Sequence, residues 1–399
     1  MNKTHLYYKS YFLLFTVSLL FLFIPNSISL WRFNGVIVYL LLALSLSLSI
    51  FHLLLCYKLY CNKTKMYILL LLILVLVNLF FTNFYERWML WLTFVLVLGA
   101  KAIDFRSIVR FHLLIEFCLC LSNIVSYGLG FVDNSLLYLG DDRLNMLEGE
   151  YVSRLSLGYP AATDFATHLL YMLIDFWILK RGLFKIPDFF ICFFLVFFVV
   201  VYCDARQAAG CMLLIVILSF IIKNHKQLRR IGKIRGLLLS LSIPIFFMIS
   251  LLVTLLYDGN DISWAAANMI LSGRLHWQSE AIQEYGVHLL GQKILFVGAG
   301  FDNAIDTYNY VDNGYIQLLL LWGGGVMAIM LILFVKIGMD SYRRNDIVLL
   351  LSLFVAGVST MITQFLFYPS YCILLLALTS SHKNNVPYAI LVKHKRKLL

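Results

Sequence analysis

The chain has 399 residues, of which 61% are hydrophobic and only 13% are charged. Soluble globular proteins contain roughly 45–50% apolar and about 25% charged residues. This composition excludes a soluble enzyme with a single membrane anchor, and it excludes a disordered or fibrous chain. It predicts an all-α polytopic membrane protein, because helices satisfy every backbone group inside lipid.

Apolar runs between charged residues predict about twelve membrane-spanning helices, each needing about 20 residues. In chain order they cover residues 10–30, 33–57, 66–84, 88–104, 107–131, 161–179, 186–203, 207–222, 236–257, 313–335, 347–366 and 368–381. The first run lacks a small-residue cleavage site after it, so we expect a retained span. All twelve would form one integral membrane domain over residues 1–399, with long loops at 132–160 and 258–312 and a basic tail at 382–399.

The formal net charge of +11 is spread unevenly over the connections. Alternate connections and the two ends hold 25 of the 32 Lys and Arg residues. The remaining connections hold seven: Arg32, Arg87, Arg143, Arg154, Arg206, Arg274 and Lys293. The positive-inside rule therefore predicts that both termini are cytoplasmic and that both long loops lie outside. The basic residues then orient the chain in the membrane and contact anionic lipid. We expect no nucleic-acid partner.

Other chemical signals in the sequence are sparse. Neither long outer loop contains any of the eight cysteines, so no extracytoplasmic disulfide framework is expected. The sequence shows no Cys-x-x-Cys or Cys/His metal spacing, and we expect no metal or other cofactor. Glu116 and Asp175 are the clearest carboxylates inside spans. Such acids belong to proton pathways in transporters, or they are buried acids that pair with a neighbouring helix.

Two outer arginines lie close to the membrane surface. Arg154 begins the segment Arg-Leu-Ser-Leu-Gly-Tyr-Pro that ends at Pro160, and Arg206 follows Asp204 at a turn between two spans. Each guanidinium suits bidentate binding of a phosphate group. The alternatives are that Arg154 snorkels to the interface and that Asp204 simply neutralises Arg206.

The second long loop carries most of the signal. Residues 272–290 show roughly helical apolar spacing and predict a short amphipathic helix with Ser272 as N-cap. This segment holds Arg274, and its His276 and Trp277 suit either sugar stacking or an interfacial belt. Further on, Asp312 suits a general base for a sugar hydroxyl, or it caps the following helix, or both. Three glycines at 323–325 are expected to permit close helix contact.

These motifs together resemble those of Wzy-type polysaccharide polymerases. The resemblance covers Arg154–Pro160, Asp204-x-Arg206, Ser272-Gly-Arg274 with Trp277, Gly298-Ala-Gly300, Asp312-Asn-Gly-Tyr315 and Gly323–Gly325. Members often have His-Pro-Asn after the glycine of the first motif, where this chain has Pro160-Ala-Ala-Thr-Asp164. The related O-antigen ligases have a catalytic His in the closing motif, where this chain has Asp312, which favours a polymerase over a ligase.

The resemblance implies a helical, GT-C-like glycosyltransferase of the bacterial inner membrane. It would move a growing O-antigen or capsule glycan from undecaprenyl pyrophosphate onto a new lipid-linked repeat unit at the outer face, without a metal, alongside a flippase and a chain-length regulator. In this scheme Asp312 and Arg274 are catalytic, Arg154, Arg206 and Arg274 bind pyrophosphate, and His276, Trp277, Asn313 and Tyr315 contact the glycan. The alternatives are a ligase or sister transferase on the same scaffold, and a lipid-linked oligosaccharide flippase.

Overall fold

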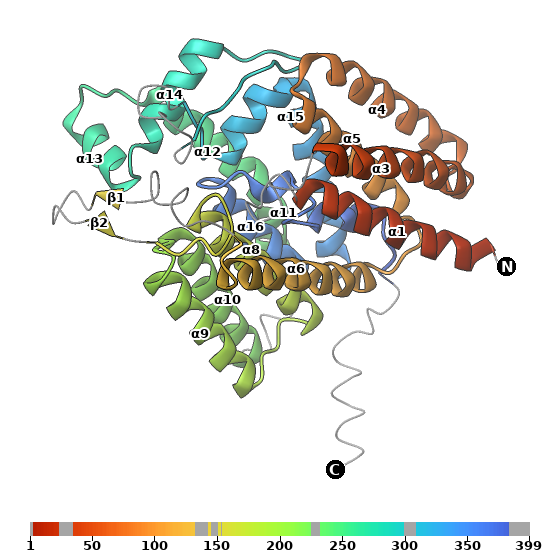
Figure 1. Cartoon of the computed structure of the whole chain (residues 1–399), viewed down its shortest axis with the longest axis horizontal. Helices are drawn as coiled ribbons and strands as arrows, with labels where there is room; N and C mark the ends of the chain where they lie inside the picture. Colours follow the sequence, from red (N-terminus) through yellow and green to blue (C-terminus); the bar gives the residue numbers. More distant parts are fainter. Residues whose placement is uncertain are drawn as a thin grey trace.

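A computed structural model describes residues 3–23, 35–131, 143–144, 151–152, 154–224, 232–298 and 309–382. This part of the chain is a helical assembly with one small antiparallel pair of two-residue strands (Figure 1). Its first half contains α1 (Lys3–Phe23), α3 (Gly35–Cys56), η2 (Tyr57–Leu59), α4 (Asn62–Phe81), α5 (Phe84–Gly99), α6 (Phe105–Gly128), β1 (Arg143–Leu144), β2 (Tyr151–Val152) and α8 (Ala162–Leu179). Its second half contains α9 (Ile186–Val201), α10 (Arg206–Asn224), α11 (Lys233–Ser240), α12 (Ser242–Leu256), α13 (Ile262–Ile270), α14 (Arg274–Tyr285), α15 (Gly314–Arg343), α16 (Ile347–Thr360), η4 (Phe365–Phe367) and η5 (Leu374–Leu378).

Six of the described helices are long and apolar enough to cross a membrane: α1, α3, α4, α6, α10 and α15. The pair α11 and α12 meets at 54° and makes a seventh candidate if it acts as one bent span. Helices α9 and α16 are apolar but shorter, with 16 and 14 residues. The described structure is therefore that of a helical membrane protein, while the expectation of twelve spans stays a prediction.

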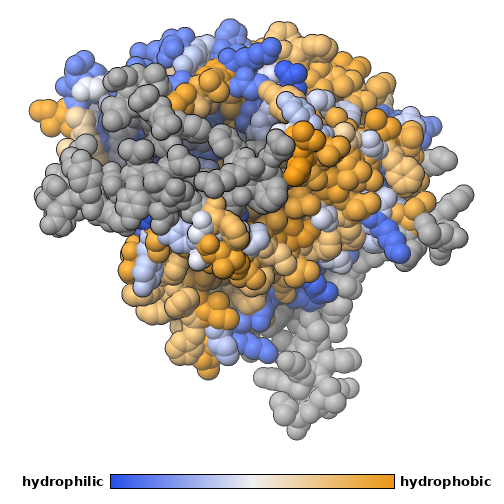
Figure 2. Space-filling view, in the orientation of Figure 1, coloured by the Kyte–Doolittle hydropathy of each residue, from blue (hydrophilic) through white to orange (hydrophobic). Residues whose placement is uncertain are grey.

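Large hydrophobic side chains cover much of the outer surface. On α9 the rings of Phe190, Phe193 and Phe194 are each more than 60% exposed. Figure 2 shows hydrophobic side chains over the α3–α4 region and over α9 and α10, and hydrophilic ones along the upper edge near α14. In water such a surface would be costly, and it is the surface expected where lipid replaces water.

The last expected span differs from the prediction. Residues 368–381 form no α-helix, and only the short η5 interrupts an irregular path. Their side chains are almost completely buried, from Tyr371 through Ala377. Irregular backbone at membrane depth is tolerated where protein surrounds it. The end of the segment is fixed to the start of α6, because Ser381 exchanges backbone hydrogen bonds of 2.7 Å with Ile103 and 2.9 Å with Phe105.

Helix α15 is broken at Gly323, whose backbone has φ +82° and ψ +165°. The chain segment 288–291 of the outer loop packs into this break, and Gly324 and Gly325 donate backbone hydrogen bonds of 2.9 Å to the carbonyls of His288 and Leu289. The expectation of close helix contact at the three glycines is therefore corrected. What approaches them is an extended loop segment, which a side chain at Gly323 would collide with.

Candidate functional site

An ion pair in the outer loop joins Arg274 to Asp312. Arg274 is the first residue of α14, and Asp312 lies two residues before α15. The Arg274 Nε and an Asp312 carboxylate oxygen are 2.5 Å apart, and the two side chains are 20% and 25% exposed. The pair is thus partly covered by protein, which strengthens its attraction, yet a ligand from outside can still reach it.

Asp312 is available for this pairing because its neighbour caps α15. The side chain of Asn313 accepts hydrogen bonds from the backbone N–H groups of Tyr315 and Ile316, at 3.0 and 3.4 Å. The alternative in which Asp312 caps the helix is therefore wrong. The same correction applies to α14, where Gly273 stands at the N-cap position, and Asn268 rather than Ser272 accepts the free N–H groups of the first turn.

Buried hydrogen bonds hold the ends of α12, α14 and α15 together beneath the pair. The Gln278 carbonyl oxygen accepts from the Thr254 hydroxyl at 3.1 Å and from the Asn313 amide at 3.3 Å. The Tyr315 hydroxyl donates to the Gly357 carbonyl at 3.0 Å. Asn313 and Tyr315 are 3% and 0% exposed, so their contacts are with the protein itself. Of the expected glycan-contacting residues, this leaves two that face outward.

Those two are His276 and Trp277 on α14. The His276 side chain is 53% exposed and lies 3.4 Å from Glu280, one turn further along the helix. Its ring packs edge-on against the half-buried Trp277, with the ring centroids 5.2 Å apart. Trp277 lies about one turn along α14 from Arg274 and His276 lies two residues along, and such exposed or half-buried rings suit contact with a sugar.

Arg154 and Arg206 both lie at the turn between α9 and α10. The Arg154 Nε donates to the Cys203 carbonyl at 3.0 Å, so the segment after the first long loop lies against this turn. Arg206 begins α10, with its side chain 77% exposed and its Nε 3.2 Å from an Asp204 oxygen. Asp204 therefore neutralises Arg206 in part, as the simpler interpretation expects, while leaving the guanidinium open to solvent.

Helix α16 forms hydrogen bonds with residues close to both groups of charged side chains. Gln207, next to Arg206, donates to the Ser359 hydroxyl at 2.7 Å, two residues along from the carbonyl that receives Tyr315. The structure thus brings Arg154 and Arg206 to one side of the end of α16, and Arg274 and Asp312 to the other.

Tyr310 lies two residues before Asp312, and the sequence does not reveal its partners. Its hydroxyl oxygen accepts a hydrogen bond of 2.5 Å from Gln364, which follows α16. Burial, together with the carboxylates of Asp164 and Asp312, raises the pKa of Tyr310 well above its usual value. Tyr310 therefore keeps its proton and remains a neutral phenol near the carboxylates of Asp164 and Asp312.

A separate set of polar side chains is buried between α6 and α8. His112 Nδ1 lies 2.6 Å from Asp175, and His168 Nδ1 lies 2.8 Å from Glu116. The second nitrogen of His112 is 3.8 Å from the other oxygen of Glu116, and all four side chains are at most 4% exposed. The sequence pointed to Glu116 and Asp175 but not to their histidine partners. The available signal was the helical spacing of four between His112 and Glu116 and of seven between His168 and Asp175.

This buried chain also approaches the geometry of a metal site. Donor atoms of Glu116, Cys120 and His168 lie within 4.8 Å of one another. Glu116 and His168 are already bonded to each other, however, and the Cys120 sulfur is 3.0 Å from the Tyr159 hydroxyl. Glu116 Oε1 and His168 Nε2 have no hydrogen-bond partner among the described residues, so these pairings satisfy the three side chains only in part.

No family model, curated protein or solved structure matches the chain. The likeness to polysaccharide polymerases therefore depends on the sequence motifs alone.

Proposed function

We propose that this protein is a polysaccharide polymerase that transfers a growing glycan from undecaprenyl pyrophosphate to a new lipid-linked repeat unit at the outer face of the inner membrane. The contact between Arg274 and Asp312 carries the proposal. It places a carboxylate and a guanidinium together, part-exposed, at the start of the helix that also carries His276 and Trp277. A glycosyl transfer from a lipid pyrophosphate needs these two chemical groups.

In the proposed reaction the acceptor hydroxyl oxygen attacks the anomeric carbon of the donor sugar. Asp312 takes the hydroxyl proton, the bond from the anomeric carbon to the pyrophosphate oxygen breaks, and its electron pair leaves with the pyrophosphate. Arg274, with Arg154 and Arg206 on the other side of α16, stabilises the charge that develops on this leaving group. Donor binding draws Arg274 from Asp312 toward the pyrophosphate, which leaves the Asp312 carboxylate free to accept the hydroxyl proton.

The test is the length of the glycan made by cells that carry Arg274→Ala or Asp312→Ala. Both variants should reduce long chains to single repeat units, because loss of a charge-stabilising or proton-accepting group costs on the order of 10²-fold in rate or more. Lys293→Ala is the matched control, since Lys293 is an exposed cation of the same loop, and it should leave chain length unchanged. Long chains in both site variants would refute the assignment. Deletion of the gene separates a polymerase, whose loss leaves single repeats attached, from a ligase, whose loss removes all attachment.

A proton-coupled transporter of lipid-linked oligosaccharides is the second candidate, and the buried chain from Asp175 to His168 favours it. Acids and histidines in sequence inside a membrane bundle are the elements of a proton relay. If this candidate holds, His168→Gln and Glu116→Gln should abolish proton-driven movement of substrate in proteoliposomes. Asp312→Ala should leave that movement intact. If the protein is instead a polymerase, Asp312→Ala should shorten the glycan, whereas His168→Gln and Glu116→Gln should leave its length unchanged.

A further inference from the structure

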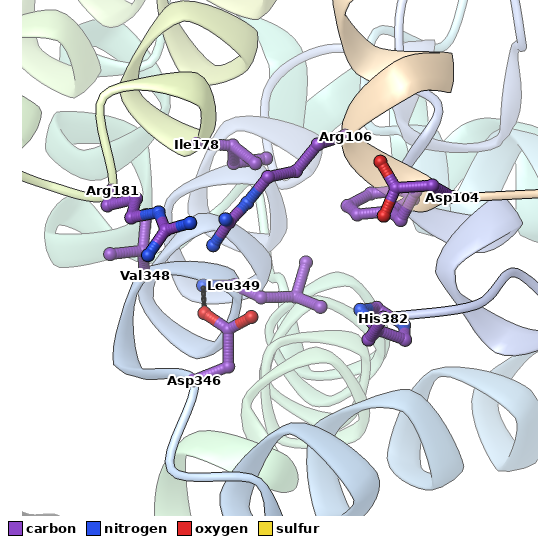
Figure 3. A pocket seen from close by; sticks show the side chains of 9 residues that line it. Asp104, Arg106, Ile178, Arg181, Asp346, Val348, Leu349 and His382 are labelled. Atoms are coloured by element: carbon purple, nitrogen blue, oxygen red, sulfur yellow. Dashed lines mark hydrogen bonds between the residues drawn. The ribbon is translucent and has the colours of Figure 1, made fainter. Parts of the chain in front are cut away.

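The pocket where α6 and α16 begin contains its own counter-charges (Figure 3). Two arginines, Arg106 and Arg181, lie there with two carboxylates, Asp104 and Asp346. Each carboxylate also caps a helix, because it accepts a backbone N–H of the first turn of α6 or α16. The charges in this pocket therefore compensate one another, and we assign no ligand to it. The set of buried side chains between α6 and α8 differs, because some of its polar atoms lack partners among the described residues.

Three side chains of metal-binding type come together between α6 and α8. Glu116 and Cys120 are four residues apart on α6, so they project from the same face of that helix. His168 comes from α8, and its side chain contacts Glu116 across the two helices. One donor atom of each of the three side chains lies within 4.8 Å of the other two. The three residues are at most 2% exposed, so the protein itself encloses this set of donors.

Two polar atoms of this set have no hydrogen-bond partner among the described residues. Glu116 Oε2 is 2.8 Å from His168 Nδ1, which leaves the other oxygen of Glu116 and the other nitrogen of His168 without a partner. His112 Nε2 is 3.8 Å from the remaining Glu116 oxygen, which is beyond hydrogen-bond distance. Burial without a partner costs free energy, and in native proteins such atoms indicate a bound ion or water.

Aromatic neighbours hold the donors in place. The His168 ring stacks on the Tyr371 ring, with the ring centroids 3.7 Å apart and an angle of 21° between the ring planes. The positions of its nitrogens are therefore fixed before any ligand binds. The Cys120 sulfur is 3.0 Å from the Tyr159 hydroxyl, which is a further oxygen donor beside the set.

A ring nitrogen, a thiol sulfur and a carboxylate oxygen are the donors that zinc prefers in proteins. Tetrahedral zinc, with bonds of about 2.0–2.3 Å, places neighbouring ligand atoms about 3.3–3.6 Å apart. The contact of 2.8 Å between Glu116 and His168 would open by about 0.5 Å, and distances of up to 4.8 Å would close by about 1.2 Å at most. Small side-chain movements thus convert this set into a zinc site. Cys120 would lose its thiol proton to solvent as the sulfur coordinates.

We propose that Glu116, Cys120 and His168 bind a zinc ion, which fixes α8 to α6. Three protein ligands leave the fourth position to the Tyr159 hydroxyl or to a water. The spacing of the sequence does not reveal this set, because Glu116 and His168 lie on different helices and are 52 residues apart. The site is structural and does not depend on the reaction at the outer surface. A bound zinc ion would also occupy two residues of the proton relay that the transporter candidate requires.

The experiment measures zinc binding by the full chain purified in detergent. Metal-stripped protein is titrated with zinc in competition with a chromophoric chelator, which gives both stoichiometry and affinity. The wild-type protein should bind one zinc ion per chain. Cys120→Ser should weaken the affinity by about 100-fold or more, since residues that merely orient a ligand already contribute about 10–100-fold. Cys118→Ser is the matched control, because Cys118 is an exposed thiol of the same helix, and it should bind zinc as the wild type does.

The absence of stoichiometric zinc binding by the wild-type protein overturns the proposal, and so does equal affinity in the wild-type and Cys120→Ser proteins. An equal loss in Cys118→Ser and Cys120→Ser also overturns it, because the exposed thiol is outside the proposed site. If Cys120→Ser does not fold, His168→Gln replaces it. Its expected loss of affinity is the same, and unchanged affinity again overturns the proposal.

Discussion

Two adjacent side chains at the start of α15 perform different tasks. Asn313 satisfies the free N–H groups of the helix, and this leaves Asp312 to face Arg274. Asparagine and aspartate are equally good N-caps, so the sequence does not tell which of the two will cap. Here the buried contact of the Asn313 amide with Gln278 decides it, because a carboxylate has no donor for that oxygen.

Asn313→Ala is expected to destabilise the protein by about 1–2 kcal/mol, because it removes a helix cap and a buried hydrogen bond. Thermal unfolding in detergent measures the change. Asn313→Asp keeps the cap but places a buried carboxylate against Gln278 and next to Asp312, so its loss should come from these contacts and not from the cap. Unchanged stability in Asn313→Ala would show that the helix start does not depend on this cap.

Burial, followed by the positive charge of Arg344, lowers the pKa of His382. The stability of the folded protein should therefore depend on pH. The unfolded chain takes up a proton near pH 6.5, whereas the folded protein does so only at lower pH. Between these two values the unfolded state binds more protons, so stability is lost as the pH falls below about 6.5. His382→Gln should reduce the drop in unfolding midpoint between pH 7.5 and pH 5.5, measured in phosphate-free buffer. The same drop in both proteins would contradict the prediction.

At the level of single residues, the sequence identified side chains by type but not by partner. Arg274 and Asp312 were both expected at the outer site, and their direct contact is a property of the fold. His112 and His168 were missed because a histidine on an apolar helix carries no signal until the neighbouring helix is known. Packing of α6 against α8 supplies that information, because it forms the hydrogen-bonded pairs His112–Asp175 and His168–Glu116, with 3.8 Å between His112 and Glu116.

At the level of elements, amphipathic spacing predicted the helix of the large outer loop, and α14 confirms it with Leu275 and Ala281 buried. The same method failed for residues 368–381, because hydropathy measures burial and not conformation. A segment surrounded by protein is as apolar as one surrounded by lipid, whether or not it is helical.

The break in α15 depends on Gly323, and Gly323→Ala tests it. A Cβ there would lie 2.2 Å from the Gly291 nitrogen, in a conformation with φ +82°. We expect a loss of more than about 2 kcal/mol, because loop and helix must separate or the backbone must change. Gly324→Ala is the matched control, since its Cβ meets nothing within 4 Å, and it should leave the unfolding midpoint unchanged or slightly raised. Similar losses in the two variants would refute this account of the break.

At the level of the whole molecule, charge distribution predicts which end of the bundle faces which compartment. Asn260 is exposed in the loop before α13, and the exposed Cys61 precedes α4 at the other end. In intact cells a membrane-impermeant maleimide should label a cysteine introduced as Asn260→Cys, and it should reach Cys61 only after lysis. The opposite pattern would invert the proposed topology and place the Arg274–Asp312 pair in the cytoplasm.

The membrane class followed from composition alone, because 61% hydrophobic residues leave few other arrangements. The order in which the helices pack did not follow, since the lipid-facing and buried sides of such helices are equally apolar. The bend between α11 and α12 and the buried final segment are features of packing, and only the structure contains them.

Because α15 is broken at Gly323, its first part can tilt as a short rigid segment about that residue. About ten residues separate the break from Asp312, a length of about 15 Å at 1.5 Å per residue. A tilt of about 10° at Gly323 therefore moves Asp312 by about 2–3 Å, enough to separate it from Arg274. The loop segment 288–291, held against the break by Asn78, sits where it sets that angle. Whatever displaces this segment thereby adjusts the spacing of the two charges.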